Sequence, residues 1–562
     1  MTLRPASIRI EEWIIIVVTA VVCVLVLAPI AVVFWQSVQA GDWSGPLALS
    51  LANYVTAATE PRLYHAIVNT IIASVGCTAI ATVAGVTLAW LVARTNMPFR
   101  RFFAVTNPIP MFLSPFVGAI AWMALAAPRA GYLNRQIADL FGLPADLLNI
   151  YGLGGIIWVQ GIFFTPLVYL MTVGSLRQMD PALEESSRSC GAGMWRTTFR
   201  ITLMLSTPSI LSGMILTFVS SAGEFGVPLA LGSPHGVETL STQIFEVLQR
   251  ENPAYSLAAA IGSVLLVSTV ALVVIHRTLV SSKQFVTITG KGFRPRLVDL
   301  RQWRYAALLL NVSYILVSVI LPIGILAIMS VHKVWLGSID VSQFTAENYV
   351  EVLVNQDATQ RGILNSLFLA IVGATVAVAI SLILSQAIYR SRLPGRRLID
   401  MVTSLPVGIP GIVLAMGMLV LFIRTPLYGT LSLLMIAYII RFTPVGQRSV
   451  AGSLLAMSPE LEESSRACGH GWFDTMRRIT LPLLKPGLTA AWVLLFTIYV
   501  RELPISILLW SSGNEVMSVV LYQLLEHATA GQTGAYAIIQ AAIALVVVVA
   551  FDRFFAGERV QR

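Results

Sequence analysis

Two glutamates in apolar surroundings are the side chains of this chain best placed to contact a charged solute. Glu224 lies in the segment SSAGEFGVPLAL, and Glu502 lies in YVRELPISILL, 278 residues further on. Each lies 16 residues after the proline that opens its predicted membrane span, Pro208 or Pro486. Sixteen residues of helix rise about 24 Å, so both carboxylates are expected in the outer part of a membrane. Carboxylates at such positions are costly and face a polar cavity or a partner.

Carboxylate oxygens are the ligands that hard cations prefer. We therefore predict that Glu224 and Glu502, with the neighbouring Arg501, line a substrate pathway. The alternative is structural: Glu502 pairs with Arg501 or another fixed group, and Glu224 is held in a similar way. No certain metal site is predicted, because the four cysteines lack the spacing of metal ligands. These cysteines, expected to be small apolar fillers, are Cys23, Cys77, Cys190 and Cys468.

A 21-residue sequence occurs twice and is the second candidate functional element. EESSRSCGAGMWRTTFRITLM (184–204) matches EESSRACGHGWFDTMRRITLP (462–482) at thirteen positions, where chance gives roughly one or two. An ordinary surface loop between spans is the alternative, but surface loops tolerate change. The agreement therefore predicts a shared constraint on the first block (180–204) and the second block (458–482).

Each block is predicted to be a short helix–turn–helix. An Asp-Pro or Ser-Pro pair opens it, at 180–181 and 458–459. Asp or Ser caps the free amides, and Pro fits the first helical position. Acidic side chains follow in the first turns, where the helix dipole favours them. They are Glu184, Glu185, Glu460, Glu462 and Glu463. Gly191 and Gly469 then interrupt the helix, and a second amphipathic stretch follows.

The composition indicates that lipid is the solvent of this chain. The sequence is 56% hydrophobic and only 12% charged, against roughly 25% charged residues in soluble domains. The run 14–35 is apolar apart from Thr19 and is long enough to cross a bilayer, which takes about 20 residues. A secretory signal peptide is the alternative, but the run is too long and no small-residue cleavage site follows.

About twelve apolar runs of this kind predict an all-α membrane protein. They lie near 14–35, 66–93, 103–127, 152–175, 208–231, 254–276, 305–331, 363–389, 399–423, 427–450, 486–510 and 534–551. Proline and glycine interrupt the third run at Pro108, Pro110 and Pro115 and the ninth at Pro406, Gly408, Pro410 and Gly411. Broken helices often line a transport pathway, although ordinary span-entry kinks explain such residues equally well.

Charge predicts the orientation. With the N-terminus inside, 29 of the 37 basic residues fall in inner segments, which is the positive-inside pattern. Both termini are therefore expected in the cytoplasm, and Arg441 is assigned, with Arg448, to the last inner segment. The net charge of +9 reflects this topology. Nucleic-acid binding is excluded, because the basic residues are divided among short loops and form no continuous patch.

The second half of the chain repeats the first. TNMPFRR (95–101) matches SRLPGRR (391–397) at an offset of 296, while the two blocks match at an offset of 278. The difference of 18 residues maps to an extra outer loop around 129–150. We predict a first permease half at 1–280, a cytoplasmic linker at 281–303 and a second half at 304–562. Two parallel six-helix repeats imply a pseudo-twofold axis along the membrane normal, with a pathway between the halves.

The two blocks resemble the EAA loop of binding-protein-dependent ABC importer permeases. The second block contains Glu463-Ser464-Ser465, Gly469, Ile479, Leu481 and Pro482 at the family spacing. The first contains Glu185-Ser186-Ser187, Gly191, Ile201 and Leu203, with Met204 in place of the proline. Both have Ser-Ser where the family has Ala-Ala. The resemblance covers essentially the whole chain and implies the type I ABC importer permease fold.

The resemblance also implies partners and a location. Each block would dock on one of two cytoplasmic ABC ATPase subunits, which bind ATP and Mg, and an extracytoplasmic binding protein would deliver the substrate. The chain would lie in a bacterial cell membrane, both termini inside. It carries no cofactor and is not expected to be an enzyme. A phosphate-binding loop needs Gly-x-x-x-x-Gly-Lys-Ser/Thr, and the only Gly-Lys pair, Gly290-Lys291, lacks the first Gly and the hydroxyl.

Two permease halves fused in one chain look like the ferric-iron permeases of this family, and the segment 287–300 resembles theirs. Ferric iron is therefore the expected cargo. Thiamine, phosphonate or polyamine import by the same machinery is the alternative. A Gly-Glu-Phe-Gly segment like 223–226 also occurs in oxyanion permeases of the superfamily, so the glutamates do not prove a cationic substrate.

The sequence disfavours two other function classes. A secondary transporter of the major-facilitator kind also has two parallel six-span halves, but it does not predict twin blocks after the fourth span of each half. A sensor or scaffold is disfavoured because the chain has no sizeable soluble domain. Co-purification of an ATPase subunit would separate these classes.

Overall fold

The computed structural model describes residues 10–40, 48–281, 297–391 and 395–560. Within these ranges the chain is helical and forms no strand, only isolated bridges. The predicted linker lies largely outside the described residues. Its described end runs along the end of the helix 61–94: the Val298 amide donates to the Arg94 carbonyl at 2.8 Å, and the Asn96 amide donates to the Val298 carbonyl at 3.1 Å.

The helices of the first half are α1 (Ile10–Ser37), α2 (Ala52–Thr59), α3 (Pro61–Arg94), α4 (Arg100–Thr106), α5 (Pro115–Ala126), α6 (Tyr132–Phe141), α7 (Leu153–Gln178), α8 (Pro181–Ser189), α9 (Met194–Thr197), α10 (Leu203–Ala222), α11 (Gly226–Leu231), α12 (Leu240–Gln249) and α13 (Tyr255–Ser281). Short 3₁₀ turns η1 (Ile109–Phe112) and η3 (Ser233–His235) and the π turn η2 (Thr198–Thr202) join them.

The helices of the second half are α14 (Trp303–Ile315), α15 (Leu321–Ser330), α16 (Glu347–Val350), α17 (Asp357–Phe368), α18 (Ala374–Tyr389), α19 (Arg396–Ser404), α20 (Gly411–Phe422), α21 (Leu431–Ala456), α22 (Glu460–Ala467), α23 (Trp472–Thr475), α24 (Leu481–Val500), α25 (Ser506–Leu509), α26 (Met517–His527) and α27 (Ala530–Val560). The turns are η4 (Leu316–Ile320), η5 (Val341–Gln343), η6 (Glu351–Asn355), η7 (Leu369–Gly373), η8 (Leu405–Val407) and η9 (Met476–Thr480).

Most of the predicted spans are long helices. Among the described residues, nine helical segments are long and apolar enough to cross a membrane, and two bent pairs raise the number to eleven. The bent pairs are the third and ninth predicted spans: Arg100–Phe112 meets Pro115–Ala126 at 94°, and Arg396–Val407 meets Gly411–Phe422 at 103°. The tenth predicted span corresponds to α21, a helix of 26 residues that is not among these eleven.

Two predicted spans are too long. The runs 208–231 and 486–510 predict continuous helices, but α10 ends at Ala222 and α24 ends at Val500. In both places the chain leaves the helix and re-enters a short buried helix, α11 or α25. The apolar composition continues through the break because these residues are buried among other helices, so hydropathy alone does not reveal it.

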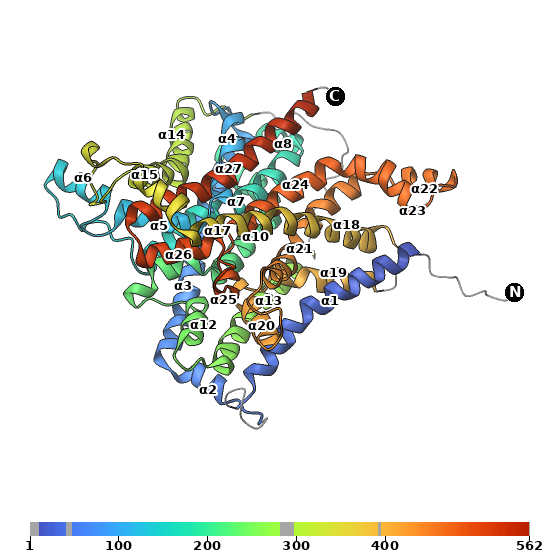
Figure 1. Ribbon diagram of the computed structural model, residues 1–562. Coiled ribbons are helices and arrows are strands. Elements are labelled where there is room, and N and C mark those ends of the chain that lie inside the picture. Colours follow the sequence, from blue (N-terminus) through green and yellow to red (C-terminus); the bar gives the residue numbers. More distant parts are fainter. Residues whose placement is uncertain (1–9, 41–47, 282–296, 392–394, 561–562) are drawn as a thin grey trace.

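The first spans of the two halves cross over to the opposite half. α1 packs against α13 of its own half and against α18 and α20 of the second half, while α15 packs against α27 and against α5 of the first half. The contact of α1 with α20 is close, since a Cβ added to Gly417 would lie 2.6 Å from the Pro29 carbonyl oxygen. Each half is therefore in contact with the other through its first span, α1 or α15 (Figure 1).

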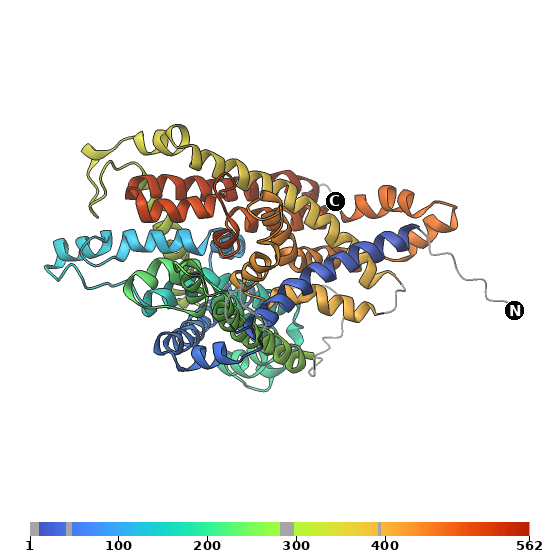
Figure 2. The same ribbon diagram turned by 60° about the horizontal axis from the view of Figure 1, so that its bottom comes forward.

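The extra loop of the first half and the second block mark opposite ends of the molecule. Residues 129–150 include α6, an amphipathic helix that projects from one end, whereas α22 and α23 project from the other in both views (Figure 1, Figure 2). The beginning of α1 lies toward the end that carries α22 and α23.

Candidate functional site

Each block folds as the predicted helix–turn–helix. The Asp180 carboxylate accepts the Ala182 amide at 2.9 Å and caps α8, and Ser458 Oγ accepts the Glu460 amide at 3.4 Å before α22. Gly191 and Gly469, at the turns, have φ of +81° and +87°. Glycine enters this left-handed region without steric cost, which explains why both interruptions fall at glycine. A π turn, η2 or η9, then joins the block to the following span.

Glu184 of the first block is buried in a charged cluster. Its carboxylate lies 3.7 Å from the Arg94 guanidinium and 3.5 Å from Arg188, and it accepts a hydrogen bond of 2.7 Å from the Thr202 hydroxyl. Arg94, the last residue of α3, is fully buried and also donates to the Met179 carbonyl at 3.3 Å. The cluster fastens α8 to the end of α3 and to the π turn.

The second block repeats this cluster. The Glu462 carboxylate lies 3.9 Å from Arg390, at the end of α18, and accepts a 2.8 Å hydrogen bond from Thr480. Arg390 donates to the carbonyls of Leu454, at 2.9 Å, and Met457. The arginine and threonine partners were not predicted from the sequence. A signal existed, because the arginines share the offset of 296 and the threonines share the offset of 278.

The four predicted coupling glutamates divide into two kinds. Glu184 and Glu462 point inward, whereas Glu185 and Glu463 are exposed on the block surfaces. Large apolar side chains of the blocks are also exposed, and they are Leu183, Trp195 and Phe199 in the first block and Leu461 and Phe473 in the second. Each block thus carries an exposed acidic side chain and exposed apolar side chains.

The prediction that all four cysteines are apolar fillers is wrong for two of them. Cys77 is buried, and Cys23 is partly buried within α1. Cys190 and Cys468, however, are exposed. Each stands at the end of the first helix of its block, directly before the left-handed glycine, where the turn carries the side chain away from the protein.

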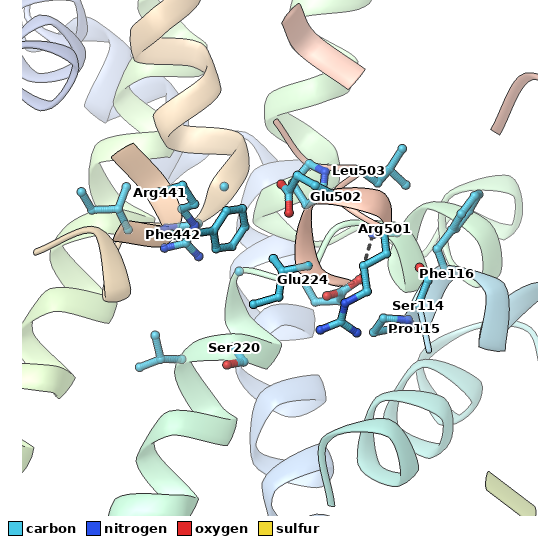
Figure 3. Close-up of a pocket in the computed structure, with 18 of the residues that line it drawn as sticks. Ser114, Pro115, Phe116, Ser220, Glu224, Arg441, Phe442, Arg501, Glu502 and Leu503 are labelled. Carbon is cyan, nitrogen blue, oxygen red and sulfur yellow. Dashed lines mark hydrogen bonds between the residues drawn. The ribbon is translucent and has the colours of Figure 1, made fainter. Parts of the chain in front are cut away.

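A cavity of about 230 Å³ lies where four helix breaks from the two halves meet. The breaks separate η1 from α5, η8 from α20, α10 from α11, and α24 from α25. The charged lining residues are Glu224, Arg441, Arg501 and Glu502, and the others include Ser114, Phe164, Ser220, Pro410, Gly411, Phe442 and Ile498. The structure therefore brings Glu224, Glu502 and Arg501 together in one cavity, as Figure 3 shows.

Both glutamates hold the chain in place after a helix break. Glu224 Oε1 accepts the Gly226 amide at 3.2 Å at the start of α11, and Glu502 Oε1 accepts the Ile505 amide at 3.1 Å just before α25. Each backbone carbonyl accepts a serine hydroxyl, from Ser241 at 2.6 Å or from Ser506 at 2.9 Å. These bonds satisfy polar groups that a helix break exposes in an apolar region, so the glutamates have a structural role besides any role in transport.

Two arginines face these carboxylates. The charge of Arg501 interacts with Glu224, and that of Arg441 with Glu502, while Arg441 lies across the cavity from Arg501 in Figure 3. No ion pair within 4.0 Å joins these four side chains in the described part of the chain. The assignment of Arg441 to a cytoplasmic segment is wrong, because it lies within α21 and lines the cavity. Arg441 lies inside the predicted run 427–450, but its charge led to its assignment to the inner segment.

The positive charges of the cavity come from the second half alone. At the offset of 278 that relates Glu224 to Glu502, Arg441 corresponds to Phe163 and Arg501 to Gly223. The cavity thus combines a symmetric pair of carboxylates with an asymmetric pair of guanidinium groups. Within the described residues, no group of three histidine, cysteine, aspartate or glutamate side chains is arranged to hold a metal ion.

Comparison with known proteins decides the family. The family described as "binding-protein-dependent transport system inner membrane component" matches residues 81–282 and 377–556, one match in each half. The chain belongs to this family. Membership confirms the predicted EAA-loop family and the all-α fold of two repeats, and it identifies a multi-pass membrane permease of the ABC importer type. The rival assignment to a secondary transporter is excluded.

Two curated relatives cover most of this permease, and a third covers a smaller part. The putative ferric transport system permease protein FbpB 1 of Haemophilus influenzae is 25% identical over 525 residues, which cover 89% of this chain and 79% of that protein. The ferric transport system permease protein FbpB of Actinobacillus pleuropneumoniae is 24% identical over 490 residues, 86% of this chain and 70% of that protein. The molybdenum transport system permease protein ModB of Escherichia coli (strain K12) is 29% identical over 168 residues, 29% of this chain and 71% of that protein.

Proposed function

We propose that this permease imports ferric iron delivered by an extracytoplasmic binding protein, driven by two separate ATPase subunits. One observation carries the choice of cargo: relatives described as ferric transport permeases match both halves and cover 86–89% of the chain. The molybdenum permease matches only 29% of it. ATP and Mg belong to the partner subunits in this proposal, and this chain supplies the pathway.

The blocks are the proposed docking sites of the ATPase subunits. Each carries an exposed glutamate, Glu185 or Glu463, and at least one exposed aromatic side chain, and aromatic residues contribute strongly to the energetics of protein interfaces. Glu184 and Glu462 do not contact the partner but hold each block against α3 or α18. Movement of a docked ATPase would then pass to these helices as a rigid displacement. In this proposal both termini and both blocks lie in the cytoplasm.

The native cysteines allow a direct test of this docking. Cys190 and Cys468 are exposed in the blocks, whereas Cys77 is buried. The complex that co-purifies from membranes would be treated with a maleimide before and after its ATPase subunits are stripped. We expect both block cysteines to be protected in the complex and labelled after stripping, with Cys77 unlabelled throughout. Equal labelling of both cysteines in the two states would contradict docking at the blocks.

Import of an oxyanion is the second candidate, and one observation favours it. Arg441 and Arg501 line the cavity, and guanidinium groups bind oxyanions well. Competition separates the candidates: excess molybdate should leave binding-protein-dependent uptake of iron unchanged if ferric iron is the cargo. Uptake of molybdate without uptake of iron would establish the second candidate.

A further inference from the structure

The cavity contains two positive charges that a pathway for a cation does not need. Two carboxylates in a site shielded from water attract a hard cation strongly, because charges interact more strongly there than in bulk water. Strong attraction favours entry, but a cation held too tightly does not leave, and conduction requires both. Arg441 and Arg501 bring the formal charge of the lining to zero.

The placement of the arginines is specific. The first half has Phe163 and Gly223 at the corresponding positions, so the repeat architecture does not require a charge at either position. Each guanidinium is also held by a carbonyl at a helix bend: Arg501 Nη1 donates to Leu113 at 2.6 Å, and Arg441 Nη1 donates to Pro406. Leu113 lies between η1 and α5, and Pro406 lies within η8, which precedes α20. The bend in each broken span is therefore bonded to a charge in the cavity.

We propose that Arg441 and Arg501 are tethered counter-ions of the Glu224–Glu502 pair: they neutralise the carboxylates in the empty pathway, and a hard trivalent cation displaces them when it enters. This inference rests on the proposed cationic cargo. Arginine suits the task because it stays charged at physiological pH and has five donors. It can keep its bond to the bend while its charge moves away from a carboxylate. After the cation leaves, the guanidinium groups return and prevent rebinding.

Binding of terbium(III), a luminescent hard trivalent cation, tests the inference without transport. The purified complex would be titrated as wild type, as Arg441→Phe with Arg501→Gly, which copies the first half, and as that double variant with Glu224→Gln and Glu502→Gln added. An opposite charge within about 4–6 Å changes the affinity of a carboxylate for a proton roughly 10- to 1000-fold. We therefore expect the double variant to bind terbium at least about tenfold more tightly than wild type, and the added Glu→Gln changes to abolish the gain.

Arg448→Gln is the matched control. It removes a positive charge from the same helix, two turns away, where Arg448 pairs with Asp400 at 3.2 Å outside the cavity. It should bind terbium as wild type does. If the double variant fails to assemble, the single variants Arg501→Gln and Arg501→Lys replace it, and only the first should gain affinity.

Two results would overturn the inference: equal terbium affinity in wild type and the arginine-free variant, or a gain that survives the Glu→Gln changes. A failure of the proposed function shows differently. If the arginines bind an oxyanion cargo, Arg501→Gln loses molybdate uptake and gains no carboxylate-dependent terbium binding. If iron is simply not transported, wild-type uptake is absent whatever the terbium titrations show.

Discussion

Removal of the charge of Glu184 should loosen the first block far more than the equivalent change loosens the second. Glu184→Gln keeps the side-chain shape and an acceptor for the Thr202 hydroxyl, but it leaves Arg94 without a counter-charge. Arg94 is fully buried, and its other bond is a single 3.3 Å contact with a carbonyl. Breaking a buried ion pair by removing one partner costs 3–5 kcal/mol. Because the hydrogen-bond acceptor survives, we expect about 3 kcal/mol.

The same change at Glu462 should cost about 1 kcal/mol, the upper value for an ion pair that water reaches. Arg390 is 14% exposed and keeps two carbonyl partners without Glu462. Hydrogen exchange of the peptides that cover the two blocks measures both effects, because local opening sets the exchange rate. A cost of 3 kcal/mol corresponds to exchange about 100-fold faster in the first block, and 1 kcal/mol to about fivefold in the second.

Glu185→Gln is the control for the first block. It removes the same charge one residue away, on the exposed surface, where substitutions change stability by about 0.5 kcal/mol or less. Exchange in Glu184→Gln no faster than in Glu185→Gln would refute the buried cluster. Equal acceleration in the two blocks would refute the asymmetry between Arg94 and Arg390.

Three further predictions follow from the same geometry. Gly191→Pro with Gly469→Pro should abolish coupled transport and the ATPase stimulation by loaded binding protein while membrane insertion stays intact; normal coupled transport would rule the blocks out as the transmission element. A cysteine at Ser233 should react with an impermeant thiol reagent from outside and a cysteine at Arg396 should not, and the reverse pattern would invert the topology. Burial, with a neighbouring carboxylate, raises the pKa of Glu238, in the loop before α12, to about 7. The folded protein then holds a proton that the unfolded chain has lost, so stability should fall as the pH rises from about 4.5 to about 7. Glu238→Gln should make the midpoint of thermal unfolding less dependent on pH over this range. An unchanged pH dependence would show that Glu238 is not the group responsible.

The elements that were predictable from the sequence are those with a local signal. Long apolar runs identify spans because lipid requires about 20 residues of them, and the twin blocks identify themselves by their agreement. The capped helix starts and the turns at Gly191 and Gly469 also follow from local residue types. Each of these features can be recognised from the residue types within one segment or from the direct match of two segments.

The missed features depend on contacts between distant segments. Glu184 and Glu185 are adjacent in the sequence. No local pattern shows that Glu184 points toward Arg94 while Glu185 is exposed. The helix ends at Ala222 and Val500 lie inside apolar runs, so hydropathy continued the spans through them. The place of Arg441 is set by the meeting of four breaks from both halves. The sequence alone therefore predicts the pair of Glu224 and Glu502 with Arg501, but it does not predict that Arg441 joins them.

Uptake of iron by the reconstituted complex tests the central claim most directly. Proteoliposomes would contain this chain with its co-purified ATPase subunits, and the binding protein loaded with radiolabelled ferric iron would be added outside. We predict uptake that requires ATP, both ATPase subunits and the loaded binding protein, and that falls in Glu224→Gln and Glu502→Gln variants whose assembly is normal. Uptake driven by an ion gradient without ATPase subunits, or wild-type rates of iron uptake in both variants, would contradict the account.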